Sequence, residues 1–210
     1  MSFKTWLKAH AADKALAPLR EELACLFTER CSVLDIGCGT GDLLFKTAHK
    51  IHRGCGIDLD KDMILFAQEQ QQKHHVNNLS FINGDALLTE IDTYDIATCT
   101  LCIHELKPNQ ACMLLQRMAL HAQRILIADY HQAHSLLAKA CIELDECCSG
   151  HYFRFKAYKR HGQITGYAQQ CGLEVTQCIK SCIDGISIWE LKGQKTHTTN
   201  SSRSQKAIHD

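Results

Sequence analysis

The sequence predicts an α/β fold, in which helices cover both faces of a doubly wound, mostly parallel sheet. Two observations predict it. Short apolar runs of strand length alternate with segments of helical periodicity between residues 31 and 130, and the first run leads directly into a glycine-rich turn; this alternation is typical of a parallel sheet buried between helical layers. With 210 residues, 45% of them apolar, the chain can build one substantial core but is short for two enzyme domains.

A helical segment precedes the first strand. Apolar residues recur at helical spacing from residue 4 to residue 27, and Pro18 falls within this stretch. Because proline lacks an N–H and its ring clashes with the preceding helical turn, we expect one or two leading helices with an interruption at Pro18.

Five strands and their helices follow in alternation. The first three apolar runs end in glycine, aspartate or asparagine, which are residues that favour turns, before helical periodicity resumes. Strands are expected at residues 31–36, 54–58, 79–82, 94–99 and 124–128, and helices at 42–48, at 62–72 and from Pro108 onward.

Beyond residue 130 the pattern changes. Helices are expected at residues 135–147 and 164–171, and a closing β-hairpin at 173–179 and 186–191. From residue 193 the chain is polar and without periodicity, which indicates a disordered tail. We therefore expect an N-terminal helical cap over residues 1–30, a main domain over 31–192 and a disordered tail over 193–210.

Charge and hydropathy narrow the range of partners without identifying one. Lys and Arg together number 23, as do Asp and Glu, so no net charge favours a nucleic acid or an acidic membrane. No apolar stretch approaches the ~20 residues of a membrane span, and the first residues lack the apolar core of a signal peptide. We expect a cytoplasmic protein that does not contact a membrane, and the oligomeric state stays open.

The 13 cysteines raise the question of a metal. Cys99 and Cys102 form a Cys-x-x-Cys pair, but no second pair follows at the spacing of a zinc site, and a structural zinc ion needs four convergent ligands. The pair also lies at the end of a predicted strand and not at a helix N-terminus, where a redox-active thiol is expected. We expect no metal and interpret most cysteines as small buried residues.

The turn after the first strand carries Gly37, Gly39 and Gly41. Glycines between a buried strand and a helix let the backbone turn sharply and approach a ligand, with helix N–H groups aimed at it. A dinucleotide site requires Gly-x-Gly-x-x-Gly, whereas here the third glycine comes one residue early and Asp42 follows. A carboxylate at that place disfavours a pyrophosphate, and with it a nucleotide-dependent oxidoreductase.

Residues 33–41, Val-Leu-Asp-Ile-Gly-Cys-Gly-Thr-Gly, resemble the first motif of class I S-adenosylmethionine-dependent methyltransferases. Residues 56–60 resemble the second motif of that family, 84–86 the third and 94–106 the fourth, in the same order and at similar spacing. The resemblance implies a Rossmann-like, seven-stranded sheet whose last strand is antiparallel, with S-adenosylmethionine as cofactor.

The resemblance also implies roles for individual residues. Asp58, at the end of the second strand, is placed to accept from both ribose hydroxyls. Asp85 would accept from the adenine amino group beside the N–H of Ala86, and Asp35 would orient the methionine ammonium. The other expected cofactor contacts are Gly37, Cys38, Gly39, Gly41, Leu59 and Thr100. Asp60 and Asp62 are better explained as caps of the following helix.

Methyl transfer is an in-line displacement that depends mainly on holding donor and acceptor together. The fourth strand ends at residues 99–106, where the acceptor should meet the methyl group, and this stretch lacks both the Asn-Pro-Pro-Tyr type of sequence and the paired glutamates of nucleic-acid and protein arginine methyltransferases. We therefore expect a small-molecule acceptor. The alternatives are a protein or RNA methyltransferase, and a cofactor-binding module without catalysis.

His104 is the candidate general base, because imidazole titrates near neutral pH and His104 lies near this edge. The alternative is a histidine that fixes the loop after the strand. Tyr130, after the fifth strand, and Tyr152 and Arg154, in an aromatic and cationic stretch that resembles a lid-proximal segment of some small bacterial methyltransferases, are candidate acceptor contacts. The aromatic residues of that stretch are equally explained as packing of the last helix on the sheet.

Overall fold

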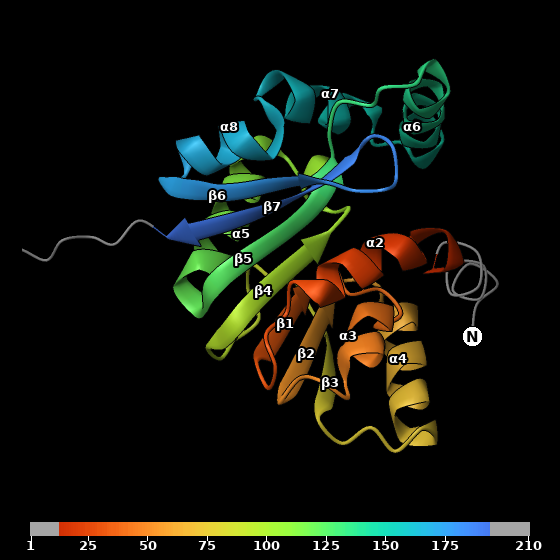
Figure 1. The fold of residues 1–210 in the computed structure, drawn as a ribbon, viewed down its shortest axis with the longest axis vertical. Helices are drawn as coiled ribbons and strands as arrows, with labels where there is room; N and C mark the ends of the chain where they lie inside the picture. Colours follow the sequence, from red (N-terminus) through yellow and green to blue (C-terminus); the bar gives the residue numbers. More distant parts are fainter. Residues whose placement is uncertain (1–12, 194–210) are drawn as a thin grey trace, which may run out of the picture.

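The computed structural model describes residues 13–193, and its seven strands form one sheet in the order β3-β2-β1-β4-β5-β7-β6 (Figure 1). The strands are β1 (Ser32–Ile36), β2 (Arg53–Asp58), β3 (Leu79–Asn83), β4 (Tyr94–Thr100), β5 (Ala122–Tyr130), β6 (Leu173–Lys180) and β7 (Ile186–Gly193). The first five strands pair in parallel, and β7 runs antiparallel to both of its neighbours. The predicted doubly wound, seven-stranded α/β fold with an antiparallel last strand is confirmed.

Helices cover both faces of this sheet. Helices α2 (Asp13–Cys25), α3 (Asp42–Thr47) and α4 (Lys61–Lys73) lie on one face, and α5 (Pro108–His121) and α8 (Gln163–Gln170) lie on the other. None of the helices within residues 13–193 is both long and apolar enough to cross a membrane. Because both faces are covered, consecutive apolar residues of the central strands are buried, and Val33, Leu34, Ile125 and Leu126 are completely so.

Two expectations about helices need correction. Helix α2 continues through Pro18, which lies inside it, so the expected interruption there is wrong; the buried Leu19 and Leu23 keep the helix on the core. The aromatic stretch after residue 150 is itself a helix, α7 (Tyr152–Arg160), between α6 (Leu136–Ser149) and α8. The expected leading helix before residue 13 and the tail from residue 194 lie outside the described residues.

The carboxyl ends of the parallel strands meet at one edge of the sheet. In Figure 1 the arrowheads of β4 and β5 point toward this edge, and α2 and α6 lie beside it. The register places Asp35 beside Gly56 of β2 and Thr98 of β4. Residues that follow successive strands are therefore brought together here although they are far apart in the sequence.

Candidate functional site

The glycine loop between β1 and α3 has a backbone that its three glycines require. Gly37, Gly39 and Gly41 have φ of 70°, 54° and 77°, in the left-handed region. At Gly41 there is a second constraint, because a Cβ atom would lie 2.5 Å from the ring of Phe81. Gly41 thus packs the start of α3 against β3.

The amides of this loop bond within the protein. Gly37 and Cys38 donate to the carbonyl of Ile57 at 2.8 and 3.2 Å, and Gly41 donates to that of Cys38 at 2.9 Å. Gly39 donates to Oδ2 of Asp58 at 2.8 Å. These four loop amides are therefore engaged within the protein and do not point at a ligand. The expectation that N–H groups of the following helix, α3, are aimed at a ligand stays a prediction.

Three carboxylates stand at the ends of β1, β2 and β3. The two oxygens of Asp58 accept from the amides of Gly39 and Asp60, each at 2.8 Å, and Asp85 accepts from the amide of Leu87 at 2.8 Å. Since each carboxylate oxygen has two acceptor sites, these contacts fix the side chains and leave capacity for a ligand. The residues predicted to cap α4 behave as expected in part, because the side chain of Asp60 accepts from two amides of its first turn.

Asp35 differs from the other two carboxylates because it is buried. Its side chain accepts a hydrogen bond from Oγ1 of Thr98 at 2.7 Å, and only 3% of the residue is exposed. Burial raises the pKa of Asp35 to about 7, with the bond from Thr98 acting in the opposite direction. At neutral pH this carboxyl group is therefore divided between its charged and neutral forms.

These side chains border a cavity of about 450 Å³, which is within the size range of ligand sites. Of its lining residues within the described chain, six carry carboxylates and one, Arg20, carries a guanidinium. Thr100 also lines it, and its Oγ1 is buried with no hydrogen-bond partner in the structure. The predicted cofactor residues that line this cavity are Asp35, Gly37, Cys38, Gly39, Asp58, Leu59, Asp85, Ala86 and Thr100. Gly41 is the exception, and packs against the ring of Phe81.

Helix α2 supplies a wall of the cavity that the sequence did not indicate. Asp13 and Arg20 both line the cavity and form an ion pair at 2.7 Å. Asp13 also accepts from Oγ1 of Thr40 in the glycine loop at 2.6 Å, and Arg20 reaches Asp42 at 3.2 Å. The helix predicted as a cap thus closes on the glycine loop through polar contacts.

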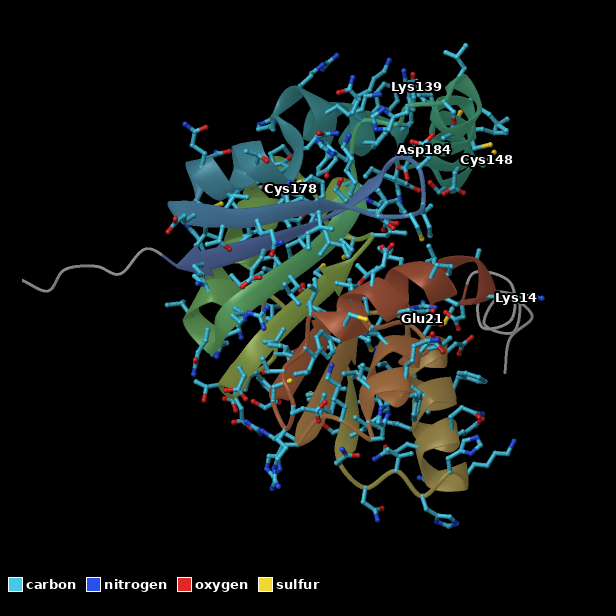
Figure 2. The ribbon with its side chains drawn as sticks, viewed as in Figure 1. Lys14, Glu21, Lys139, Cys148, Cys178 and Asp184 are labelled. Carbon is cyan, nitrogen blue, oxygen red and sulfur yellow. The ribbon has the colours of Figure 1, made fainter. Side chains whose placement is uncertain are left out.

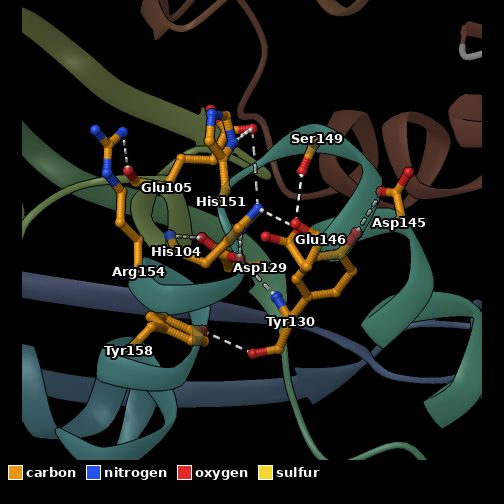
Figure 3. A network of polar contacts seen from close by, with 10 residues as sticks. All are labelled: His104, Glu105, Asp129, Tyr130, Asp145, Glu146, Ser149, His151, Arg154 and Tyr158. Carbon is orange, nitrogen blue, oxygen red and sulfur yellow. Dashed lines mark hydrogen bonds and ion pairs between the residues drawn. The ribbon is translucent and has the colours of Figure 1, made fainter.

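His104 lies in a short 3-10 turn, η2 (Ile103–Glu105), between two buried acids (Figure 3). Its Nδ1 is 2.5 Å from Oδ1 of Asp129, and its Nε2 is 3.2 Å from Oε1 of Glu146. The backbone N–H of His104 also donates to Asp129, at 3.2 Å. We call these three residues, which are each at most 2% exposed, the His104 cluster.

The surroundings of His104 favour the imidazolium. Burial alone would lower its pKa, but the charges and hydrogen bonds of Asp129 and Glu146 outweigh it and raise the pKa to about 11. Both ring nitrogens face carboxylates, so neither is free to accept a proton from an acceptor. This arrangement matches the alternative interpretation, a histidine that fixes the loop, better than a general base.

The three candidate acceptor contacts do not line the cavity. Tyr130 is buried with its ring 4.6 Å from that of His104, Tyr152 is 3.5 Å from Glu143, and the exposed Arg154 donates to the carbonyl of Glu105 at 3.0 Å. Glu105, which the sequence analysis did not single out, does line the cavity. Its position directly after His104 in the sequence could have indicated that Glu105 lies near the cavity.

The cysteines are dispersed, and the expectation that most of them are buried is wrong: of the 13, four are buried, three are partly buried and six are exposed. Cys99 is buried and Cys102 lines the cavity, whereas Cys148 on α6 and Cys178 on β6 are exposed at separate places (Figure 2). Within residues 13–193 no group of three or more His, Cys, Asp or Glu side chains is arranged to hold a metal ion.

Comparisons with known proteins agree with this geometry. A family model described as a methyltransferase domain matches residues 27–191. The pre-miRNA 5'-monophosphate methyltransferase of Danio rerio is 28% identical, with 71% of this chain and 72% of that protein covered.

Solved structures with the same fold include two methyltransferases. The mitomycin 7-O-methyltransferase MmcR superposes with a TM-score of 0.64 at 15% identity over 90% of this chain and 60% of its own. The magnesium protoporphyrin IX methyltransferase of Synechocystis PCC 6803, solved with bound SAH, gives a TM-score of 0.61 at 15% identity over 92% of this chain and 88% of its own. At this identity the likeness concerns the fold.

Proposed function

The chain belongs to the family of methyltransferase domains and uses S-adenosylmethionine as methyl donor, and from this premise we propose that it methylates a small molecule at the carboxyl edge of β4. The observation that carries the proposal is the cavity, which is lined by six carboxylates against one guanidinium. Such a site attracts a ligand that bears positive charge and hydroxyl groups, and repels a pyrophosphate.

The residues of the cavity fit this cofactor. We propose that Asp58 accepts from the ribose hydroxyls, Asp85 from the adenine amino group and Asp35 from the ammonium. Arg20, which pairs with Asp13 and Asp42, lines the same cavity and would face the carboxylate of the cofactor. The unpartnered Oγ1 of Thr100 requires a hydrogen-bond partner, which a ligand in this cavity can supply.

When bound, the cofactor supplies a methyl group activated on a sulfonium. The protein holds the methyl donor and the acceptor in the orientation that transfer requires. The loop after β4 closes one side of the cavity and α2 closes the other, and together they exclude water from the reacting atoms. We propose that Glu105 contacts the acceptor, since its carboxylate lies at the cavity next to the His104 cluster. We also propose that His104 fixes this loop and does not act as the base.

We propose that a small acceptor binds between α2 and the loop after β4, because residues of both segments line the cavity. Structural relatives named for mitomycin and for protoporphyrin are consistent with it. RNA is the second candidate, because one relative is named for pre-miRNA and α7 carries Arg154, Lys156, Lys159 and Arg160 without an acidic residue.

Two measurements test the proposal. Calorimetry should show binding of S-adenosylmethionine and S-adenosylhomocysteine but not of NAD. Transfer of a radiolabelled methyl group should then label a fraction of a metabolite extract and leave total cellular RNA and protein unlabelled. Label found in RNA would favour the second candidate, and binding of NAD alone would contradict the cofactor site.

The raised pKa of Asp35 leads to a pH dependence of cofactor binding. In the free protein the pKa of this carboxyl is about 7, and a bound ammonium favours the charged form and lowers it. Binding therefore releases a proton below neutral pH, and affinity should fall up to about tenfold per unit between about pH 7 and 5. It should be constant from pH 7.5 to 8.5.

Calorimetry with S-adenosylhomocysteine at four pH values measures this dependence. Asp35→Asn is the matched control, since the amide does not titrate: it should bind more weakly at pH 8 and lose the slope below pH 7. If the variant keeps the slope of the native protein, another group is responsible and Asp35 does not meet the ammonium.

A further inference from the structure

Helix α6 is held to the protein in an unusual way. A surface helix is normally stabilised by an apolar face packed on the core, but of the 14 residues of α6 the buried one is Glu146. Leu136, Leu137 and Leu144 are exposed. The attachment of α6 therefore depends on a charged side chain more than on apolar packing.

Glu146 makes one strong contact, to the loop beside the cofactor cavity. Its Oε1 lies 3.2 Å from Nε2 of His104, while its Oε2 is buried with no hydrogen-bond partner in the structure. The other polar contacts of α6 are weaker or exposed: Asp145 is 3.4 Å from the hydroxyl of Tyr130, and Glu143 pairs with Lys159 at the surface. Exposed pairs of this kind contribute little.

The contact of Glu146 with His104 connects α6 to the cavity through the loop that follows β4. Leu101 has φ of 50°, which is a strained conformation for leucine, and His104 is clamped by Asp129 through both its ring and its backbone. Glu105 follows and lines the cavity. Movement of α6 away from His104 would therefore remove one of the two charges that hold this loop.

We propose that Glu146 is a positioning residue for methyl transfer: through His104 it holds α6 as a lid beside the acceptor side of the cavity, and release of this contact opens the lid. Figure 1 shows α6 at the same edge of the sheet as α2. A lid with one fully buried side chain, whose other contacts are partly buried or exposed, belongs to the part of a fold that opens most easily. A half-paired buried carboxylate stabilises the closed state only modestly, which lets α6 open without unfolding the sheet.

Hydrogen exchange of the native chain and of Glu146→Gln tests this proposal. In the variant, amides of residues 136–149 should exchange about tenfold faster or more, while amides of β1, β4 and β5 keep their protection. Affinity for S-adenosylhomocysteine should stay within about twofold. The matched control is Glu143→Gln on the same helix, which removes an exposed ion pair and should change exchange in α6 by less than about threefold.

A spectroscopic readout separates positioning from general stability. In the native protein, nitrogen NMR of His104 should show an imidazolium up to pH 9; in Glu146→Gln its titration midpoint should fall by a unit or more, and in Glu143→Gln it should not move. Unchanged exchange of α6 in Glu146→Gln would overturn the proposal, and so would loss of protection throughout the sheet.

The purpose assigned to the lid, to cover the acceptor, rests on the proposed function, whereas the movement of α6 does not. Neither exchange nor NMR requires an acceptor, so a failure of the lid and a failure of the proposed acceptor class give different results.

Discussion

Replacing Asp129 by alanine should lower the free energy of unfolding by about 3–5 kcal/mol, as removal of one partner from a buried ion pair does. Asp129 is completely buried and accepts from the ring and backbone of His104 and from the backbone of Tyr130 at 2.7 Å. Its loss strands a buried cation and two backbone donors. For a chain of this length the melting temperature should fall by about 10 °C.

Chemical denaturation with matched thermal scans measures the effect. Asp92→Ala is the control, because Asp92 is exposed and forms a surface ion pair with Arg53 at 3.2 Å, and should cost less than about 1 kcal/mol. Equal losses in the two variants would show that the His104 cluster does not stabilise the fold.

The pH dependence of stability, compared between the native protein and Asp129→Ala, tests whether His104 is charged in the folded state. The pKa of His104 is raised from 6.5 to about 11, so its charge stabilises the folded state fully below about pH 6.5 and progressively less as pH rises toward 11. The difference between native protein and Asp129→Ala should therefore be largest at pH 6 and shrink by pH 9.5. A difference that grows with pH would mean that His104 is neutral in the fold.

The sequence was sufficient for the sheet and for bringing the carboxylates at the strand ends to one edge, because both depend on local patterns. An apolar run followed by glycines or aspartate places a residue at a strand end, and parallel strands bring their ends to one edge. Asp35, Asp58 and Asp85 could therefore be placed together from the sequence, although they come from three different strands.

The wall formed by α2 and the contact of Glu146 with His104 could not be predicted in the same way. Arg20 and Asp13 reach the glycine loop only because α2 packs across it, and no spacing within residues 13–25 indicates this. One feature weakly indicated that Glu146 is buried. It lies on the same helical face as Ala138 and Ile142, which are both partly buried. A buried glutamate at such a position requires a partner, but the sequence does not say which one.

The role of His104 shows why residue type alone was insufficient. An ordinary imidazole in this position is a reasonable base, and His104 does lie in the turn that follows β4. What changes its chemistry is the pair of acids that face it, and these lie 25 and 42 positions further along the chain. Their effect on its pKa depends on distances that only the folded structure provides.

The second large effect is expected at Asp58, where alanine should weaken binding of S-adenosylmethionine and S-adenosylhomocysteine by about a hundredfold. A hydrogen bond to a charged group contributes about 1.5–3 kcal/mol, and we propose that Asp58 accepts from two ribose hydroxyls. The same side chain accepts from the amides of Gly39 and Asp60. Its removal therefore also loosens the glycine loop that forms the floor of the cavity.

Calorimetry on the native chain, Asp58→Ala and Asp62→Ala separates these contributions. Asp62 lies in the first turn of α4, close in sequence but not among the residues that line the cavity, so its replacement should leave affinity within about twofold. The two cofactor forms share the ribose, and for this reason both should lose affinity equally in Asp58→Ala. A loss confined to one form would place Asp58 near the sulfur, and unchanged affinity for both would mean that β2 does not carry the ribose contact. Either outcome would require a different orientation of the cofactor in a cavity that six carboxylates line.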